Sequence, residues 1–145
     1  MLIIDDRLTF RVLRGSYNWL PAGHDPSELA TTTAYYYRLI IGTLREEPLG
    51  VHSSALAELT QTERTQVIAR LRYPEPLVTI LDPRTSLHTA AAVAVDAGRL
   101  NHLQAEAIAA ALSEEAVLAV TALSPGFAAA CAAYGLTLHH IELTR

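Results

Sequence analysis

The chain has 145 residues, half of them hydrophobic and 18% charged, which indicates one globular domain over residues 1–145 and excludes a disordered protein. A formal net charge of -4 excludes a generally basic, histone-like nucleic-acid binder, while a local basic patch or an acidic metal site stays open. The single cysteine excludes an internal disulfide and a CxxC zinc site. Without a signal-peptide pattern or a membrane-length apolar stretch, we expect a cytoplasmic protein and no membrane partner.

Hydrophobic runs, capping residues and breakers predict alternating strands and helices, with capping boxes that begin helices at Thr60 and Asn101. In chain order they indicate strand 1–4, helix 7–14, helix 26–45, helices 53–59 and 60–72, strand 77–81, helices 85–97 and 101–112, strand 116–121, helix 124–134 and strand 136–143. Pro48 and Gly50 are expected to close the segment after the third element. Because threonine and tyrosine are mediocre helix formers, a short strand at Ala30–Thr33 followed by a helix is the alternative for the third element.

The order of these elements predicts the fold class. Continuous apolar strands separated by helices are typical of a parallel sheet covered on both faces. We therefore expect a three-layer α/β domain with a four- or five-stranded, mostly parallel sheet.

Three acids follow predicted strands. Asp5 and Asp6 come after the first strand and Asp82 after the second. Ligands of open parallel sheets bind outside the carboxyl ends of the strands, and clustered carboxylates there hold Mg²⁺ or Mn²⁺. The alternative is that these acids cap nearby helices.

Two further patterns concern basic and aromatic residues. Arg7, Arg11 and Arg14 form one stripe along the first helix, which either contacts phosphates or an acidic partner or is a solvated face. In the run Tyr35–Tyr37, successive side chains point about 100° apart, so at most one or two can face a common ligand. The six histidines show no zinc-ligand spacing and are interpreted as structural.

Several strings resemble those of PIN domains, the fold of VapC-type toxins and other metal-dependent ribonucleases. Leu2-Ile3-Ile4-Asp5 is similar to the opening strand with its first metal-binding Asp, and Leu29–Gly42 to the second strand and following helix. His88–Ala97 and Leu100–Leu112 resemble the paired alanine-rich helices, and Leu118–Thr121 the strand that carries the "LVT" string. The resemblance implies a three-layer PIN-like fold, a homodimer or a small antitoxin-like partner protein, and RNA or DNA as a ligand.

The acidic site of that family is only partly present. Asp5 matches the first acid, but Arg38 stands where the second, a Glu, would be. Glu106 could replace the third only if the alignment slips by one residue, and Leu123 stands at the fourth. Since Mg²⁺ needs several hard oxygen ligands, we expect two-metal hydrolysis to be lost or severely weakened, with no cofactor or only weakly bound Mg²⁺ or Mn²⁺. A guanidinium at position 38 is expected to form a cleft ion pair with Asp5.

Three functional hypotheses follow. The first is a PIN-like protein of toxin–antitoxin ancestry, a degraded nuclease that binds a partner protein or nucleic acid. The second is an active Mg²⁺- or Mn²⁺-dependent endoribonuclease with Asp5, Asp82 and Glu106 as catalytic residues and Asp5 and Asp6 as metal ligands. The third is an interaction module with no nucleic-acid role.

Overall fold

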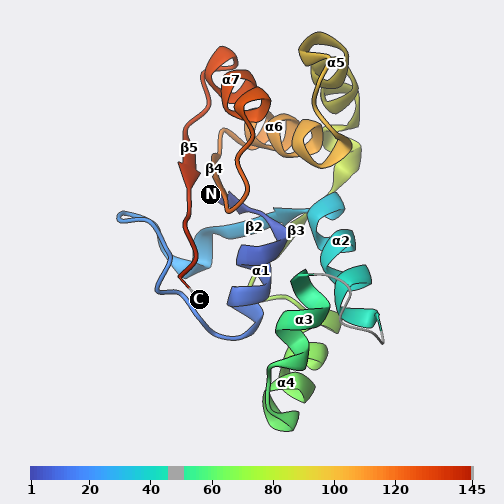
Figure 1. Cartoon of the computed structure of the whole chain (residues 1–145). Coiled ribbons are helices and arrows are strands. Elements are labelled where there is room, and N and C mark those ends of the chain that lie inside the picture. The colour runs from blue at the N-terminus through green and yellow to red at the C-terminus, as the bar shows by residue number, and fades with distance from the viewer. Residues whose placement is uncertain (46–50, 145) are drawn as a thin grey trace.

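The computed structural model describes residues 1–45 and 51–144 and contains one five-stranded sheet, in which every pairing is parallel (Figure 1). The strands are β1 (Leu2–Ile4), β2 (Leu29–Thr32), β3 (Thr79–Leu81), β4 (Val117–Val120) and β5 (Leu138–His140). The α-helices in the described ranges are α1 (Asp6–Leu13), α2 (Thr33–Leu44), α3 (Val51–Ala57), α4 (Gln61–Arg72), α5 (Leu87–Ala97), α6 (His102–Glu114) and α7 (Pro125–Ala133). Two short 3-10 helices are η1 (Pro26–Glu28) and η2 (Pro83–Thr85).

Helices cover both faces of the sheet, which makes the predicted three-layer α/β class correct. Alternate residues of β1 point to opposite faces: Ile3 joins the core under α5, α6 and α7, whereas Leu2 and Ile4 pack against α1. A third cluster joins α1 to α2, α3 and α4. Figure 1 shows the same division, with α5 to α7 on one side of the strands and α1, α3 and α4 on the other.

The strand order β3-β2-β1-β4-β5 places a reversal at the centre of the sheet. From β1 the chain builds outward through β2 and β3, then returns to pair β4 with the other side of β1. In open α/β sheets the crevice at such a reversal, beyond the carboxyl ends of the strands, is the usual ligand site. In this chain the carboxyl ends of β1 and β4 border that crevice.

The segment 26–45 folds as the alternative interpretation expected, as a strand and then a helix. The prediction of one helix from Pro26 was wrong, because Leu29–Thr32 pairs with both β1 and β3. The hydroxyl of Thr31 also donates to the carbonyl of Ile4 at 2.9 Å. Pro48 and Gly50, expected to end this segment, lie outside the described residues.

The predicted capping boxes at Thr60 and Asn101 are present, each with the reciprocal pair of hydrogen bonds. Gly98 ends α5 in the left-handed conformation, at φ 64°. In residues 1–45 and 51–144, the structure contains no helix with both the length and the apolar character needed to span a membrane.

Candidate functional site

Asp5 directly follows β1 and caps α1, and its carboxylate accepts three hydrogen bonds from protein donors. Oδ1 accepts from the backbone N–H of Leu8 at 3.0 Å. Oδ2 accepts from the backbone N–H of Thr121 at 2.6 Å and from its hydroxyl at 2.7 Å. Burial raises the pKa of Asp5 above its ordinary value, while the hydrogen bonds from Thr121 and Leu8 act in the opposite direction. Asp5 thus ties together β1, α1 and the residue after β4.

Asp6, the first residue of α1, is the acid that meets basic groups. Its buried Oδ2 lies 2.5 Å from Nε2 of His52 and 3.4 Å from Nε of Arg38. The prediction that Arg38 pairs with Asp5 is therefore wrong, because Arg38 pairs with Asp6. The reason is local, because the capping role turns Asp5 towards Leu8 and β4, and the next helical position points towards α2 and α3.

His52 was interpreted from the sequence as structural, and its contact with Asp6 was missed. The ring is buried and lies 6.1 Å from the ring of Phe10, centroid to centroid. Its side chain packs so closely on α2 that a Cβ at Gly42 would lie 2.9 Å from the Cβ of His52. The glycine inside an otherwise bulky helix is the one sequence signal that could have indicated a close neighbour at this point.

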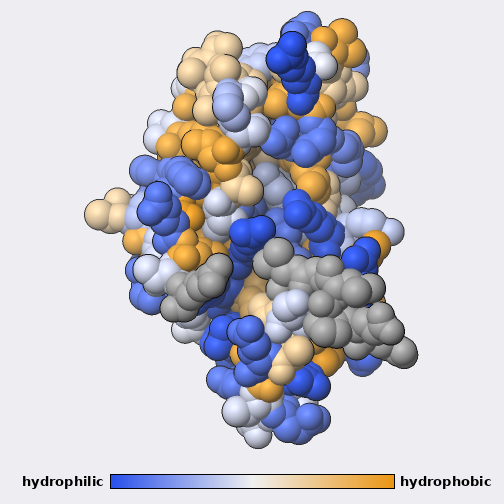
Figure 2. Space-filling model, in the orientation of Figure 1, coloured by the Kyte–Doolittle hydropathy of each residue, from blue (hydrophilic) through white to orange (hydrophobic). Residues whose placement is uncertain are grey.

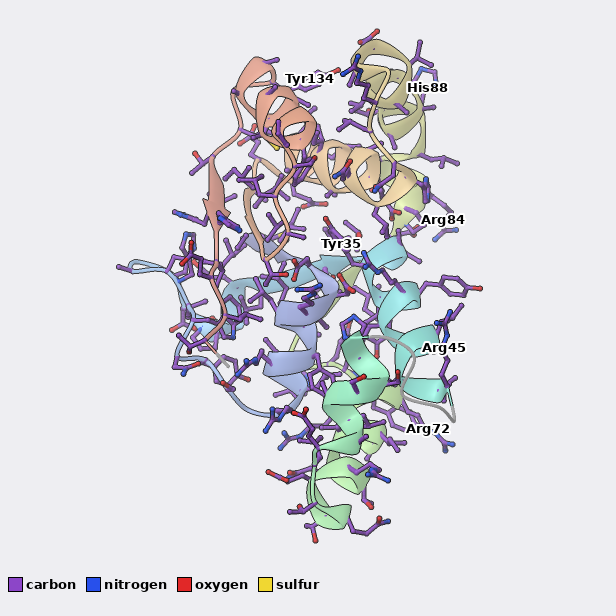
Figure 3. All side chains as sticks on the ribbon, in the orientation of Figure 1. Tyr35, Arg45, Arg72, Arg84, His88 and Tyr134 are labelled. Carbon is purple, nitrogen blue, oxygen red and sulfur yellow. The ribbon has the colours of Figure 1, made fainter. Side chains whose placement is uncertain are left out.

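Asp82 lies apart from the other acids. It follows β3, the edge strand, which is separated from β1 by β2. Its carboxylate pairs with the guanidinium of Arg84, with Nη2 to Oδ2 at 2.6 Å, and caps η2 through the backbone N–H of Arg84. These bonds lower the pKa of Asp82. Figure 3 shows Arg84 at the outer edge of the molecule.

Glu106 is buried on α6 although it is charged. Its side chain is 7% exposed, and Oε2 lies 3.5 Å from Nε2 of His102, one turn earlier on the same helix. Within the described ranges, no group of three or more His, Cys, Asp or Glu side chains is placed to hold a metal ion. Asp5, Asp82 and Glu106 thus do not form the shared acidic site that two-metal hydrolysis needs. The residues present do not fit a pair of Mg²⁺ or Mn²⁺ ions.

A groove of about 750 Å³ opens between α2 and the pair α5 and α6, and we call it the arginine groove. Its charged and polar lining includes Arg7, Arg38, Arg45, His52, His102 and Glu106. Its apolar lining includes Tyr37, Ile41, Leu87, Ala90 and Leu103. A narrower hollow of about 120 Å³ at the ends of β1 and β4 shares Arg7, Arg38 and Leu103 with it and is also lined by Asp5, Asp6 and Thr121.

Basic side chains outnumber acidic ones in the lining of the groove, although the chain as a whole is acidic. Among its described lining residues stand three arginines and one carboxylate, against a formal charge of -4 for the whole chain. Figure 2 shows hydrophilic side chains gathered in the middle of this face, between α6 and the start of α1. Asp6 offsets the charge of Arg38, so the excess of positive charge in the groove is small. An excess of positive charge in a concave site favours an anionic ligand.

The predicted arginine stripe divides between two surroundings. Arg7 lines the arginine groove. Arg11 donates from Nη2 to the carbonyl of Thr144 at 3.3 Å, beside the C-terminal segment. Arg14 lines a separate small hollow, which Arg11 and Glu63 also line. Hydrogen bonds from Thr60 chiefly lower the pKa of Glu63, and the positive charge of Arg14 lowers it further. Only Arg7 of the three therefore contributes to the groove.

The three consecutive tyrosines also separate. Tyr35 is buried, and burial raises the pKa of its phenol; Figure 3 shows it in the middle of the molecule. The hydroxyl of Tyr36 donates to the carbonyl of Leu71 and so joins α2 to α4. Tyr37 is 64% exposed and lines the arginine groove. One of the three tyrosines faces the groove, in agreement with the prediction that at most one or two could face a common ligand.

No model of a known protein family matches the sequence, and no curated protein matches it. The assignment of a function rests on the residues and their geometry.

Proposed function

We propose that the chain is a PIN-like protein of toxin–antitoxin ancestry whose nuclease site has degenerated, and that it binds nucleic acid in the arginine groove. One observation carries the proposal: the arginines gather in a groove at the carboxyl edge of a parallel sheet, while the neighbouring acids have protein partners. Phosphate oxygens are the natural partners of planar guanidinium groups.

The site favours binding over hydrolysis. Asp5 accepts one hydrogen bond from Leu8 and two from Thr121, and Asp6 is paired with His52 and Arg38. A cation would have to displace these donors before it gained ligands. We therefore derive no metal-dependent step.

Salt-dependent binding tests the proposal. Anisotropy of labelled single-stranded RNA and DNA oligonucleotides, measured over a range of salt concentrations, gives the slope of log K against log salt. Each phosphate contact in a single strand contributes about -0.7 to that slope. The double variant Arg7→Ala, Arg45→Ala should lower the magnitude of the slope by roughly 1.4, because two groove arginines are removed.

A matched control removes the same charge elsewhere. Arg11→Ala, Arg14→Ala changes the net charge equally on a surface outside the arginine groove and should leave the slope unchanged. If neither oligonucleotide binds in a salt-dependent way, or if only the control variant changes the slope, the proposal is wrong.

Calorimetry separates the proposal from the active-nuclease hypothesis. Mg²⁺ and Mn²⁺ are titrated into the wild-type protein and into Asp5→Asn. We expect millimolar metal to bind no more tightly to the wild-type protein than to Asp5→Asn, because most of the acceptor capacity of Asp5 is used by hydrogen bonds from Leu8 and Thr121. Tight binding that is lost in Asp5→Asn would favour the ribonuclease hypothesis. The homodimer or antitoxin-like partner stays a prediction, for which light scattering and co-purification are the direct tests.

A further inference from the structure

Glu106 is a buried carboxylate that the proposed binding of phosphates does not use. It lies on α6, 5% exposed, and its side chain lines the arginine groove. The partner that the structure gives it is His102, whose side chain is 72% exposed and whose Nε2 lies 3.5 Å away. Burial of a carboxylate is costly unless donors reach its oxygens, so the carboxylate is well suited to hydrogen bonds from a ligand.

Two other kinds of group line the same groove as this carboxylate. Arg7 and Arg38 supply cations, and Arg38 is 54% exposed although it contacts Asp6. Tyr37 supplies an exposed aromatic ring on α2. Exposed aromatic rings stack with bases, and arginines bind the phosphates of a single strand. The groove thus offers a partner for each part of a nucleotide: a carboxylate for the base edge, an aromatic ring for the base face and arginines for the phosphate.

The chemistry of a carboxylate decides which base it prefers. An ionised carboxylate is an acceptor only, with two oxygens side by side. The Watson–Crick edge of guanine offers two adjacent donors, N1–H and the N2 amino group. Adenine and cytosine offer one amino group next to a ring acceptor, and uracil offers one N–H between two carbonyl oxygens. Guanine is the base that satisfies both carboxylate oxygens without placing an acceptor against them.

We propose that Glu106 selects guanine in the arginine groove by accepting from its N1–H and N2 amino group. The inference rests on the proposed nucleic-acid binding and adds its base specificity. Single-stranded nucleic acid is required, because the Watson–Crick edge must be free.

Anisotropy with four RNA octamers tests the inference. One is oligo(U), and the others carry a single central guanosine, inosine or adenosine. A good bidentate contact discriminates by roughly five- to one-hundred-fold, so the guanosine octamer should bind at least about fivefold more tightly than oligo(U). Inosine lacks the N2 amino group and should lose most of that advantage. This comparison uses the wild-type protein alone and needs no variant to fold.

Variants locate the effect. Glu106→Gln keeps the size of the side chain but replaces one acceptor with a donor, so the preference for guanosine should fall below about twofold while affinity for oligo(U) is not reduced. Glu114→Gln removes the same charge from an exposed position on the same helix and should keep the preference.

The outcomes distinguish failure of the guanine preference from failure of the proposed nucleic-acid binding. Binding of all four octamers with equal affinity refutes the inference and leaves the proposed function standing. A guanosine preference that survives Glu106→Gln, or that inosine retains in full, also refutes it. If no octamer binds, the proposed function fails and the inference fails with it.

Discussion

Replacing Asp5 with alanine is expected to destabilise the fold strongly although the residue resembles a catalytic acid. Asp5 accepts the N-cap hydrogen bond of α1 from Leu8 and two hydrogen bonds from Thr121 after β4. Its side chain is buried, so water does not readily replace it as the acceptor for these donors. The substitution therefore leaves backbone N–H groups unpaired in the first turn of α1 and directly after β4.

The magnitude follows from these contacts. Loss of a helix N-cap costs about 1 kcal/mol. A backbone N–H left unpaired at Thr121 costs about 1–3 kcal/mol more, since the residue is largely shielded from solvent. The sum is ~3 kcal/mol in the free energy of unfolding, or roughly a 10 °C fall in Tm for a domain of this size.

Urea unfolding followed by circular dichroism measures the change. Asp82→Ala is the matched control, because Asp82 also follows a strand and caps a short helix but is exposed and pairs with Arg84. Its loss should lower stability far less. A change below about 1 kcal/mol for Asp5→Ala, or equal losses for the two variants, would refute the structural role assigned to Asp5.

The same carboxylate gives a pH dependence with a defined sign. Because burial raises the pKa of Asp5, the folded protein binds its proton more readily than the unfolded chain does. The contribution of Asp5 to stability therefore falls as pH rises from the unfolded value of about 3.8 through the folded pKa. Asparagine does not titrate, so the stability of Asp5→Asn relative to wild type should improve across that window. A constant difference between the two would contradict this account.

Two substitutions test the packing of α2. Gly42→Ala should lower the free energy of unfolding by about 1–2 kcal/mol, because the new Cβ would lie 2.9 Å from the Cβ of His52. Gly126→Ala is the control and should not lower it, because no atom lies within 4 Å of the new Cβ. Tyr36→Phe should cost about 1 kcal/mol, since the carbonyl of Leu71 loses its hydroxyl donor. Chemical denaturation measures both, and wild-type stability in either Gly42→Ala or Tyr36→Phe would show that α2 is packed differently.

Much of the fold could be predicted because its signals are local. The apolar run that ends at Asp5 predicted β1, and the capping boxes at Thr60 and Asn101 predicted the starts of α4 and α6. The strand β2 was only an alternative, since its threonines fit a strand but Asp25-Pro26 before it fits a helix start. That helix start proved to belong to the short η1. Local propensity does not decide between the two when pairing with both β1 and β3 is available.

The site could be predicted less well because it depends on contacts between distant segments. Arg38 was expected to meet Asp5 and meets Asp6, and one position along a helix turns a side chain by about 100°. His52 comes from α3, 46 residues after Asp6. Its place depends on how α3 packs against α2, for which the only local sign is Gly42. Arg7, Arg11 and Arg14 were expected to form one stripe along the first helix, yet Arg7 lines the arginine groove and the other two line a separate hollow.

The pairing of β1 with β4 has a consequence for the order in which the chain can assemble. Leu2 lies opposite Val117, 115 positions later (117 minus 2). One edge of β1, the central strand, therefore stays unpaired until most of the chain has left the ribosome. Contacts of such long range slow folding, and an unpaired strand edge can join other chains. A nascent or truncated chain that ends before β4 therefore exposes one edge of its most apolar strand, and synthesis that pauses there should increase its need for chaperones.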